Sequence, residues 1–120
     1  MKTSYFGNIK NLPAGKAVAI CQGVPHWYHG PGNIRLAPTW AMIRIAKEDP
    51  KLYKRYYNVL LLKLNPFNEF NRMEAMVNNG AILLCYEKPG EFCHRRLVAE
   101  WFEFHLGIEV PEFQSQEELL

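Results

Sequence analysis

Apolar residues gather into two short runs that are typical of buried strands. Ala17–Cys21 is a continuous apolar run followed by Gln-Gly, and Ala81–Tyr86 is the second. A strand in a parallel sheet shows such a run, because helices cover both of its faces. We therefore predict two strands here. The mixed, polar start of the chain contains Ser4–Ile9, which could be a loop lining a site or the lead into another strand.

Apolar residues at helical spacing predict the elements that pack against these strands. Thr39 suits an N-cap, and Pro50 suits the first turn of a following helix. Val59–Leu64 could extend that second helix or form a strand of its own. The predicted helices cover Trp40–Lys47, Lys51–Asn58, Asn68–Asn78 and Cys93–Leu106.

The order of strand, long loop, helices, strand and helix is an α/β pattern with few strands. We predict one small three-layer domain over residues 1–113, with a short, mostly parallel sheet flanked by helices. Residues 114–120 are expected to form a loose tail. Ligands of such sheets bind beyond the carboxyl ends of the strands, which here are Cys21–Gly23 and Cys85–Glu87.

Composition narrows the class of protein but not its activity. The chain has 120 residues, 48% of them hydrophobic, and a net charge of +2 that is too small to indicate nucleic acid by itself. Three cysteines are an odd number, which excludes a full disulfide framework. There is no signal-peptide pattern, and the apolar runs are too short to span a bilayer. We therefore predict a cytoplasmic protein with free thiols and no membrane partner.

The candidate chemistry lies where a loop meets the last predicted helix. That junction places four functional side chains next to one another: Cys93, His94, Arg95 and Arg96. A helix N-terminus favours anions and stabilises a thiolate. We predict that Arg95 or Arg96 binds an anion and that Cys93 is a nucleophile or redox group. Its acid–base partner would be His94 or Glu87. The structural alternative is a small residue packing the helix start beside arginines that pair with nearby carboxylates.

The long loop Gly23–Pro38 is rich in glycine, proline, histidine and aromatic residues. A structureless stretch of this length in a small domain is usually functional. Its rings and basic groups suit a nucleobase or nucleotide, and they equally suit a loop pinned by its own side chains. The candidate substrate contacts are His26, Trp27, Tyr28, His29 and Arg35, with Tyr5 from the first segment.

No motif in the sequence points to a bound cofactor. The glycines make neither a dinucleotide-binding nor a P-loop pattern. Cys85, Cys93 and His94 match none of the common zinc spacings, and a fourth ligand is missing. Cys21, His26 or His29 could supply one in space. We therefore predict no metal and no cofactor, with Cys85 an inert core residue in its apolar run.

One segment resembles a known family. Residues 84–96 read Leu-Cys-Tyr-Glu-Lys-Pro-Gly-Glu-Phe-Cys-His-Arg-Arg and resemble the Cys-x-Glu…Cys-His-Arg signature of the DUF488 family, whose function is unknown. Ser4–Asn8, Leu36–Pro38 and Val110–Glu112 resemble one of its subgroups. The resemblance implies a compact α/β domain with its site around Cys85, Glu87, Cys93, His94 and Arg95. Many members carry Asp-x-Arg after an early strand, where this chain has Ile20–Gly23.

Three functions are compatible with these residues, and the first is favoured. It is an enzyme acting on a small anionic, phosphorylated or nucleotide-like substrate. The second is a module that binds a nucleotide, an anion or nucleic acid without turnover. The basic and tyrosine-rich stretch Lys51–Lys63 could then contact nucleic acid. The third is a structural motif, with Arg95 buried in hydrogen bonds to the protein alone and no open pocket beside it. Oligomeric state is not predicted.

Overall fold

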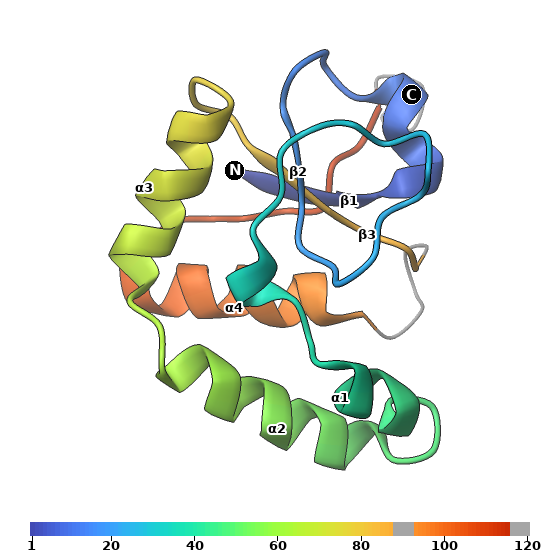
Figure 1. Cartoon of the computed structure of the whole chain (residues 1–120). Helices are drawn as coiled ribbons and strands as arrows, with labels where there is room; N and C mark the ends of the chain where they lie inside the picture. Colours follow the sequence, from blue (N-terminus) through green and yellow to red (C-terminus); the bar gives the residue numbers. More distant parts are fainter. Residues whose placement is uncertain (88–92, 116–120) are drawn as a thin grey trace.

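A parallel sheet forms the centre of the computed structural model, which describes residues 1–87 and 93–115 (Figure 1). Its strands lie in the order β1-β3-β2, and both outer strands run parallel to the central one. Their bounds are β1 Lys2–Tyr5, β2 Ala17–Ala19 and β3 Ile82–Cys85. The prediction of an α/β fold with a short parallel sheet is confirmed. Of the two alternatives for Ser4–Ile9, Ser4 and Tyr5 end a strand, and a 3₁₀ helix follows directly.

The helices begin close to the predicted caps. The four described α-helices are α1 Trp40–Ile45, α2 Pro50–Leu62, α3 Pro66–Met76 and α4 His94–Leu106. The side-chain oxygens of Thr39, Asp49 and Asn65 accept backbone N–H groups at the starts of the first three. Helix α2 continues through Val59–Leu62, because Tyr57 and Leu61, one turn apart, are both buried.

The α-helices cover one face of the sheet (Figure 1). Val18 and Leu83 from the strands pack in one buried cluster with Tyr57, Met73 and Phe102, which come from α2, α3 and α4. This cluster fixes α4 along the sheet, so that its N-terminus lies near the carboxyl end of β3. The described part of the chain contains no helix that is long and apolar enough to cross a membrane.

The opposite face of the sheet is covered by a 3₁₀ helix and a loop. Here the 3₁₀ helix η1 (Phe6–Asn11) and the long loop form the outer layer, without an α-helix among the described residues. Phe6 packs edge-on against Tyr28, with ring centroids 5.3 Å apart. Within residues 1–87 and 93–115, the α-helices therefore flank one side of the sheet, and η1 with the loop flanks the other.

The long loop is pinned by its own groups. It contains a short 3₁₀ helix, η2 (Ile34–Leu36), and the buried Tyr28 donates its hydroxyl to the carbonyl of Pro31 at 2.6 Å. Ala19 exchanges backbone hydrogen bonds with Pro31 and Asn33 at 3.0 and 2.8 Å. The loop thereby covers the outer edge of β2. Without it, the backbone groups of this edge strand could pair with another chain.

Candidate functional site

A cavity of about 610 Å³ lies at the carboxyl ends of β2 and β3. This volume is in the range of small-molecule sites. Helices α1 and α2 and the start of α4 complete its wall, and most of its lining surface is apolar. The lining residues are Cys21, Gln22, Gly23, Pro38, Trp40, Ile43, Ala46, Lys47, Pro50, Tyr53, Cys85, Tyr86, Glu87, Cys93 and His94.

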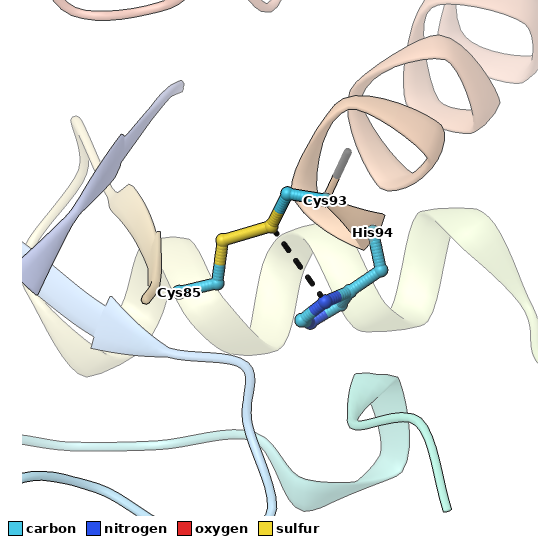
Figure 2. Close-up of side chains that lie close together, drawn as sticks. All are labelled: Cys85, Cys93 and His94. Carbon is cyan, nitrogen blue, oxygen red and sulfur yellow. Dashed lines mark hydrogen bonds between the residues drawn. A yellow bond between two sulfur atoms is a disulfide. The ribbon is translucent and has the colours of Figure 1, made fainter. Parts of the chain in front are cut away.

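Two cysteines at the base of this cavity form a disulfide (Figure 2). Cys85 ends β3 and Cys93 is the N-cap of α4, so the short connection between these elements brings them together. The prediction of three free thiols was wrong, because an odd number of cysteines excludes a complete framework but still permits one bridge. Cys85 is buried in the core as predicted, and it is bonded to Cys93. Cys21 remains free.

The contacts of His94 determine which of its ring nitrogens carries the hydrogen. Its Nε2 lies 2.6 Å from the carbonyl oxygen of Ile20, and its Nδ1 lies 3.8 Å from Cys93 Sγ (Figure 2). A carbonyl only accepts hydrogen bonds, so Nε2 carries the hydrogen and Nδ1 presents a lone pair to the sulfur. Burial lowers the pKa of His94 to about 4; the Ile20 bond opposes this and the Arg95 charge adds to it. The ring is therefore neutral at pH 7.

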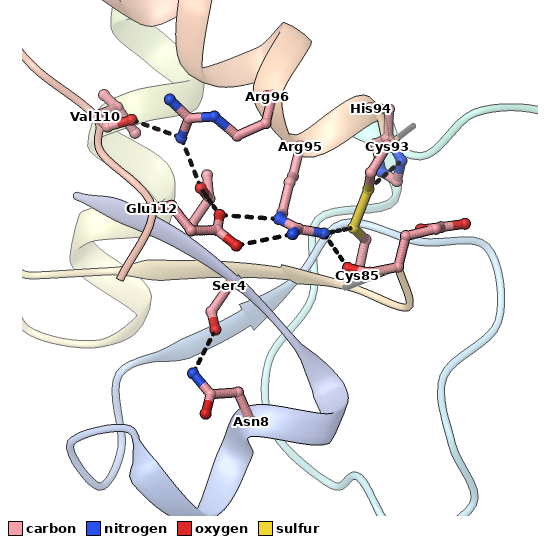
Figure 3. A network of polar contacts seen from close by, with 11 residues as sticks. Ser4, Asn8, Cys85, Cys93, His94, Arg95, Arg96, Val110 and Glu112 are labelled. Carbon is pink, nitrogen blue, oxygen red and sulfur yellow. Dashed lines mark hydrogen bonds and ion pairs between the residues drawn. A yellow bond between two sulfur atoms is a disulfide. The ribbon is translucent and has the colours of Figure 1, made fainter. Parts of the chain in front are cut away.

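Arg95 lies behind the disulfide and is held by the protein's own groups (Figure 3). Nη1 donates to Cys85 Sγ at 2.9 Å and also to the backbone carbonyl of Glu87. Nε and Nη2 form a bidentate pair with the Glu112 carboxylate at 3.0 and 2.8 Å. The Tyr5 ring lies 5.9 Å from the guanidinium carbon. Arg95 thus ties the end of β3 to the C-terminal segment.

Arg96 extends this network away from the cavity (Figure 3). Its Nη1 donates to Thr3 Oγ1 at 2.8 Å and to the Val110 carbonyl at 2.9 Å. Thr3 Oγ1 in turn donates to Glu112 at 2.6 Å. The cavity lining includes neither Arg95 nor Arg96 among the residues described. The structural hypothesis expects Arg95 to bond to the protein alone and to have no open pocket beside it. The hydrogen bonds agree with this hypothesis, whereas the cavity does not. An anion-binding role for the two arginines stays a prediction.

The remaining predicted site residues separate into two groups. Glu87 lines the cavity and is half-buried, while its carbonyl, not its carboxylate, bonds to Arg95. The substrate-loop candidates are absent from the described lining of this cavity. Three of them, Trp27, Tyr28 and His29, line a smaller cavity of about 300 Å³. The others are His26 and Arg35, both exposed, and Tyr5; Arg35 pairs with Glu69 at 3.5 Å.

Sequence reasoning missed the aromatic wall of the cavity. Trp40, Tyr53 and Tyr86 come from α1, α2 and the end of β3. The apolar pattern of α1 was available in the sequence, but it predicts a helix face that packs on the core. In the structure, α1 buries no residue fully. Trp40 is 57% exposed, because this face of α1 borders the cavity.

Cys21 was also missed as a cavity residue. Its Sγ lies 3.4 Å from the Leu84 carbonyl. Burial, followed by the charge of Glu87, raises the pKa of its thiol to about 12. Cys21 is therefore protonated at neutral pH and a poor nucleophile.

The geometry can be compared with known proteins. The sequence profile of a family described as a domain of unknown function, DUF488, matches residues 33–102. The chain belongs to the DUF488 family. The matched range includes both bridged cysteines, His94 and Arg95, whereas β1, β2 and Glu112 lie outside it. No curated protein and no solved structure gives a significant match. The family description carries no activity, so a function for this DUF488 protein has to come from its site.

The disulfide makes a first prediction for this DUF488 protein. After air oxidation and unfolding in denaturant, one thiol per chain should react with a chromogenic disulfide reagent, and three should react after reduction. Peptide mapping should place the free thiol at Cys21. A reactive Cys85 or Cys93 in the oxidised protein would contradict the assigned pairing.

Proposed function

We propose that this protein is a thiol-dependent enzyme in which Cys93 is the nucleophile and His94 accepts its proton. The observation that carries the proposal is the orientation of the imidazole. Its hydrogen is committed to Ile20, and its free lone pair faces Cys93 Sγ at 3.8 Å. An unprotonated nitrogen beside a thiol at a helix N-terminus is the arrangement that produces a reactive thiolate. The Cys85–Cys93 disulfide is then the oxidised resting form.

The chemical step follows from this arrangement. A small-molecule thiol reduces the disulfide by two electrons and two protons, becomes a disulfide itself, and returns thiols to Cys85 and Cys93. The Cys93 thiol then transfers its proton to Nδ1 of His94. The thiolate attacks an electrophilic carbon of the substrate, and the leaving group departs with its bonding electrons and recovers the proton from the imidazolium. Water then releases the acyl or similar group from sulfur. Burial keeps the His94 ring neutral beside the disulfide, so its Nδ1 is unprotonated when reduction returns a thiol to Cys93.

The cavity lining supports a flat, mostly uncharged substrate. Trp40 and Tyr86, both about half exposed, offer ring surfaces, as a nucleobase or another aromatic group requires. Lys47 is the single basic lysine or arginine side chain in the described lining, so it can accept one anionic group, such as a phosphate. A nucleotide-like molecule with its ring in the cavity and its phosphate at the mouth fits this distribution.

The alternative is a module that binds such a molecule without turnover. One observation favours it: Cys93 is only 7% exposed, and in its oxidised form it cannot act as a nucleophile. A nucleic-acid partner has less support, because Tyr53 and Tyr57 of the basic α2 stretch are buried in the core. The enzyme proposal also places the protein in a reducing cytoplasm, where Cys93 is a thiol.

Reaction with 4-nitrophenyl acetate tests the proposal, because this ester combines a flat ring with an electrophilic carbon. The reduced, metal-free protein should release a burst of one equivalent of 4-nitrophenol and gain an acetyl group at Cys93. Cys93→Ser should abolish the burst, and His94→Gln should slow it by about 100-fold or more. Cys21→Ser is the matched control and should react like the wild type.

Two results would decide against catalysis by Cys93. The first is a burst that persists in Cys93→Ser, since another group would then be reacting. The second is the absence of a burst in the wild type, combined with saturable binding of adenosine monophosphate that leaves the reactivity of the thiols unchanged. That combination would favour the binding module.

A further inference from the structure

We propose that the reduced form of the site binds a thiophilic divalent cation, such as Zn²⁺, through Cys85, Cys93 and His94. The three ligand atoms, the two Sγ atoms and His94 Nδ1, lie within 4.8 Å of one another (Figure 2). Two thiolates and one imidazole are a ligand set that zinc proteins use. The inference goes beyond the proposed function and does not depend on it.

The backbone spacing suits two thiolates that share a cation. The Cα atoms of Cys85 and Cys93 lie 7.4 Å apart, wider than the roughly 4.4–6.8 Å that is usual for disulfides. Once the bridge is reduced, the two sulfur atoms can therefore move apart around an ion while β3 and α4 stay in place. Both cysteines and His94 are buried, which shields such a site from bulk water.

Contacts outside the cluster orient the ligands as metal sites require. His94 donates Nε2–H to the Ile20 carbonyl, which fixes the tautomer that leaves Nδ1 free. Metal-bound histidines have such a second partner almost without exception. Arg95 donates to Cys85 Sγ at 2.9 Å and would stabilise its thiolate. The charge also balances, because two thiolates neutralise the cation, and Glu112 neutralises Arg95.

The coordination is left open on one side. The described metal-ligating atoms that lie together number three, and all three residues line the cavity. A fourth position directed at the cavity would take water or a ligand atom, as catalytic zinc sites do. Binding converts two thiols into thiolates, so each cation that enters releases two protons and leaves the disulfide form unavailable.

Cobalt(II) is the first probe, because its spectrum reports the ligands without any variant. The wild-type protein, reduced with a phosphine and freed of metal, should bind one equivalent of Co²⁺. It should then show the intense visible bands of a tetrahedral site and the near-ultraviolet bands of sulfur-to-cobalt charge transfer. Zn²⁺ should displace the cobalt and erase both sets of bands. The oxidised protein should show neither.

Variants then assign the ligands. The affinity for Zn²⁺ is measured by competition with a chromogenic chelator. Cys85→Ser, Cys93→Ser and His94→Gln should each lower this affinity by more than the 10–100-fold that is lost when a residue hydrogen-bonded to a metal ligand is replaced. Cys21→Ser, which changes another cavity cysteine, should bind like the wild type. Octahedral cobalt without charge-transfer bands, or equal losses in Cys21→Ser, would overturn the proposal. The ester assay uses metal-free protein, so a failure there is separate from a failure here.

Discussion

Replacing Arg95 with methionine should lower the free energy of unfolding by about 3–5 kcal/mol, the usual loss when one member of a buried ion pair is removed. Arg95 is 1% exposed, and its bidentate contact with Glu112 joins α4 to the C-terminal segment. The variant leaves the Glu112 carboxylate with Thr3 as its remaining partner among the contacts described here. Urea unfolding at pH 7 measures the change.

Two further variants show whether the ion pair is the cause. The double variant Arg95→Met/Glu112→Gln should recover part of the loss, because it removes the uncompensated charge as well. Arg96→Met is the matched control, since Arg96 bonds to neutral oxygens of Thr3 and Val110; it should cost about 1.5 kcal/mol. Equal losses in Arg95→Met and Arg96→Met would contradict the role given to Arg95.

Acidification should destabilise the protein through His94. Its pKa is lowered from 6.5 to about 4 in the folded chain, so between these values the unfolded chain binds more protons. Stability is therefore intact above pH 6.5 and is lost as the pH falls through this window, by on the order of 3 kcal/mol in total. Urea unfolding of the oxidised protein, with the Cys85–Cys93 disulfide intact, at pH 7 and pH 4.5 measures the difference.

The His94→Gln variant isolates this contribution, because glutamine can still donate to the Ile20 carbonyl but does not titrate. It should be less stable than the wild type at pH 7, and most of the gap should close at pH 4.5. His105→Gln, at an exposed position of the same helix, should keep the wild-type pH dependence. A gap that stays constant with pH would rule out a neutral His94.

Short-range sequence patterns predict most of the helices and strands. Side-chain caps at Thr39, Asp49 and Asn65 start helices where the sequence predicts them, and the apolar run Ala81–Tyr86 gives β3. Strand β1 was harder to assign, because its pattern is short and polar: Thr3 and Ser4 are fully buried and Ser4 accepts a hydrogen bond from Asn8. Polar residues that are buried because they hydrogen-bond to one another do not produce the alternation of apolar and polar positions by which a strand is predicted.

The site was predicted in part. The segment 93–96 was identified as the centre of the chemistry, and Cys93, His94 and Glu87 do line one cavity. Arg95 or Arg96 was expected to bind an anion there. The partners that hold the two arginines, Glu112, Thr3 and Val110, are distant in the chain, and sequence spacing cannot reveal them. The bridge between Cys85 and Cys93 likewise depends on where β3 ends relative to α4.

The central claim is that His94 activates Cys93 at the base of the cavity. The rate of iodoacetamide alkylation at each cysteine of the reduced, metal-free protein, measured by mass spectrometry across pH, tests it most directly. The account predicts that Cys93 reacts fastest, with an apparent thiol pKa below the ordinary value of about 8.5, and that His94→Gln slows it. Cys21, whose pKa is raised to about 12, should react slowest. A Cys93 that reacts no faster than Cys21, or is unaffected by His94→Gln, would contradict the account.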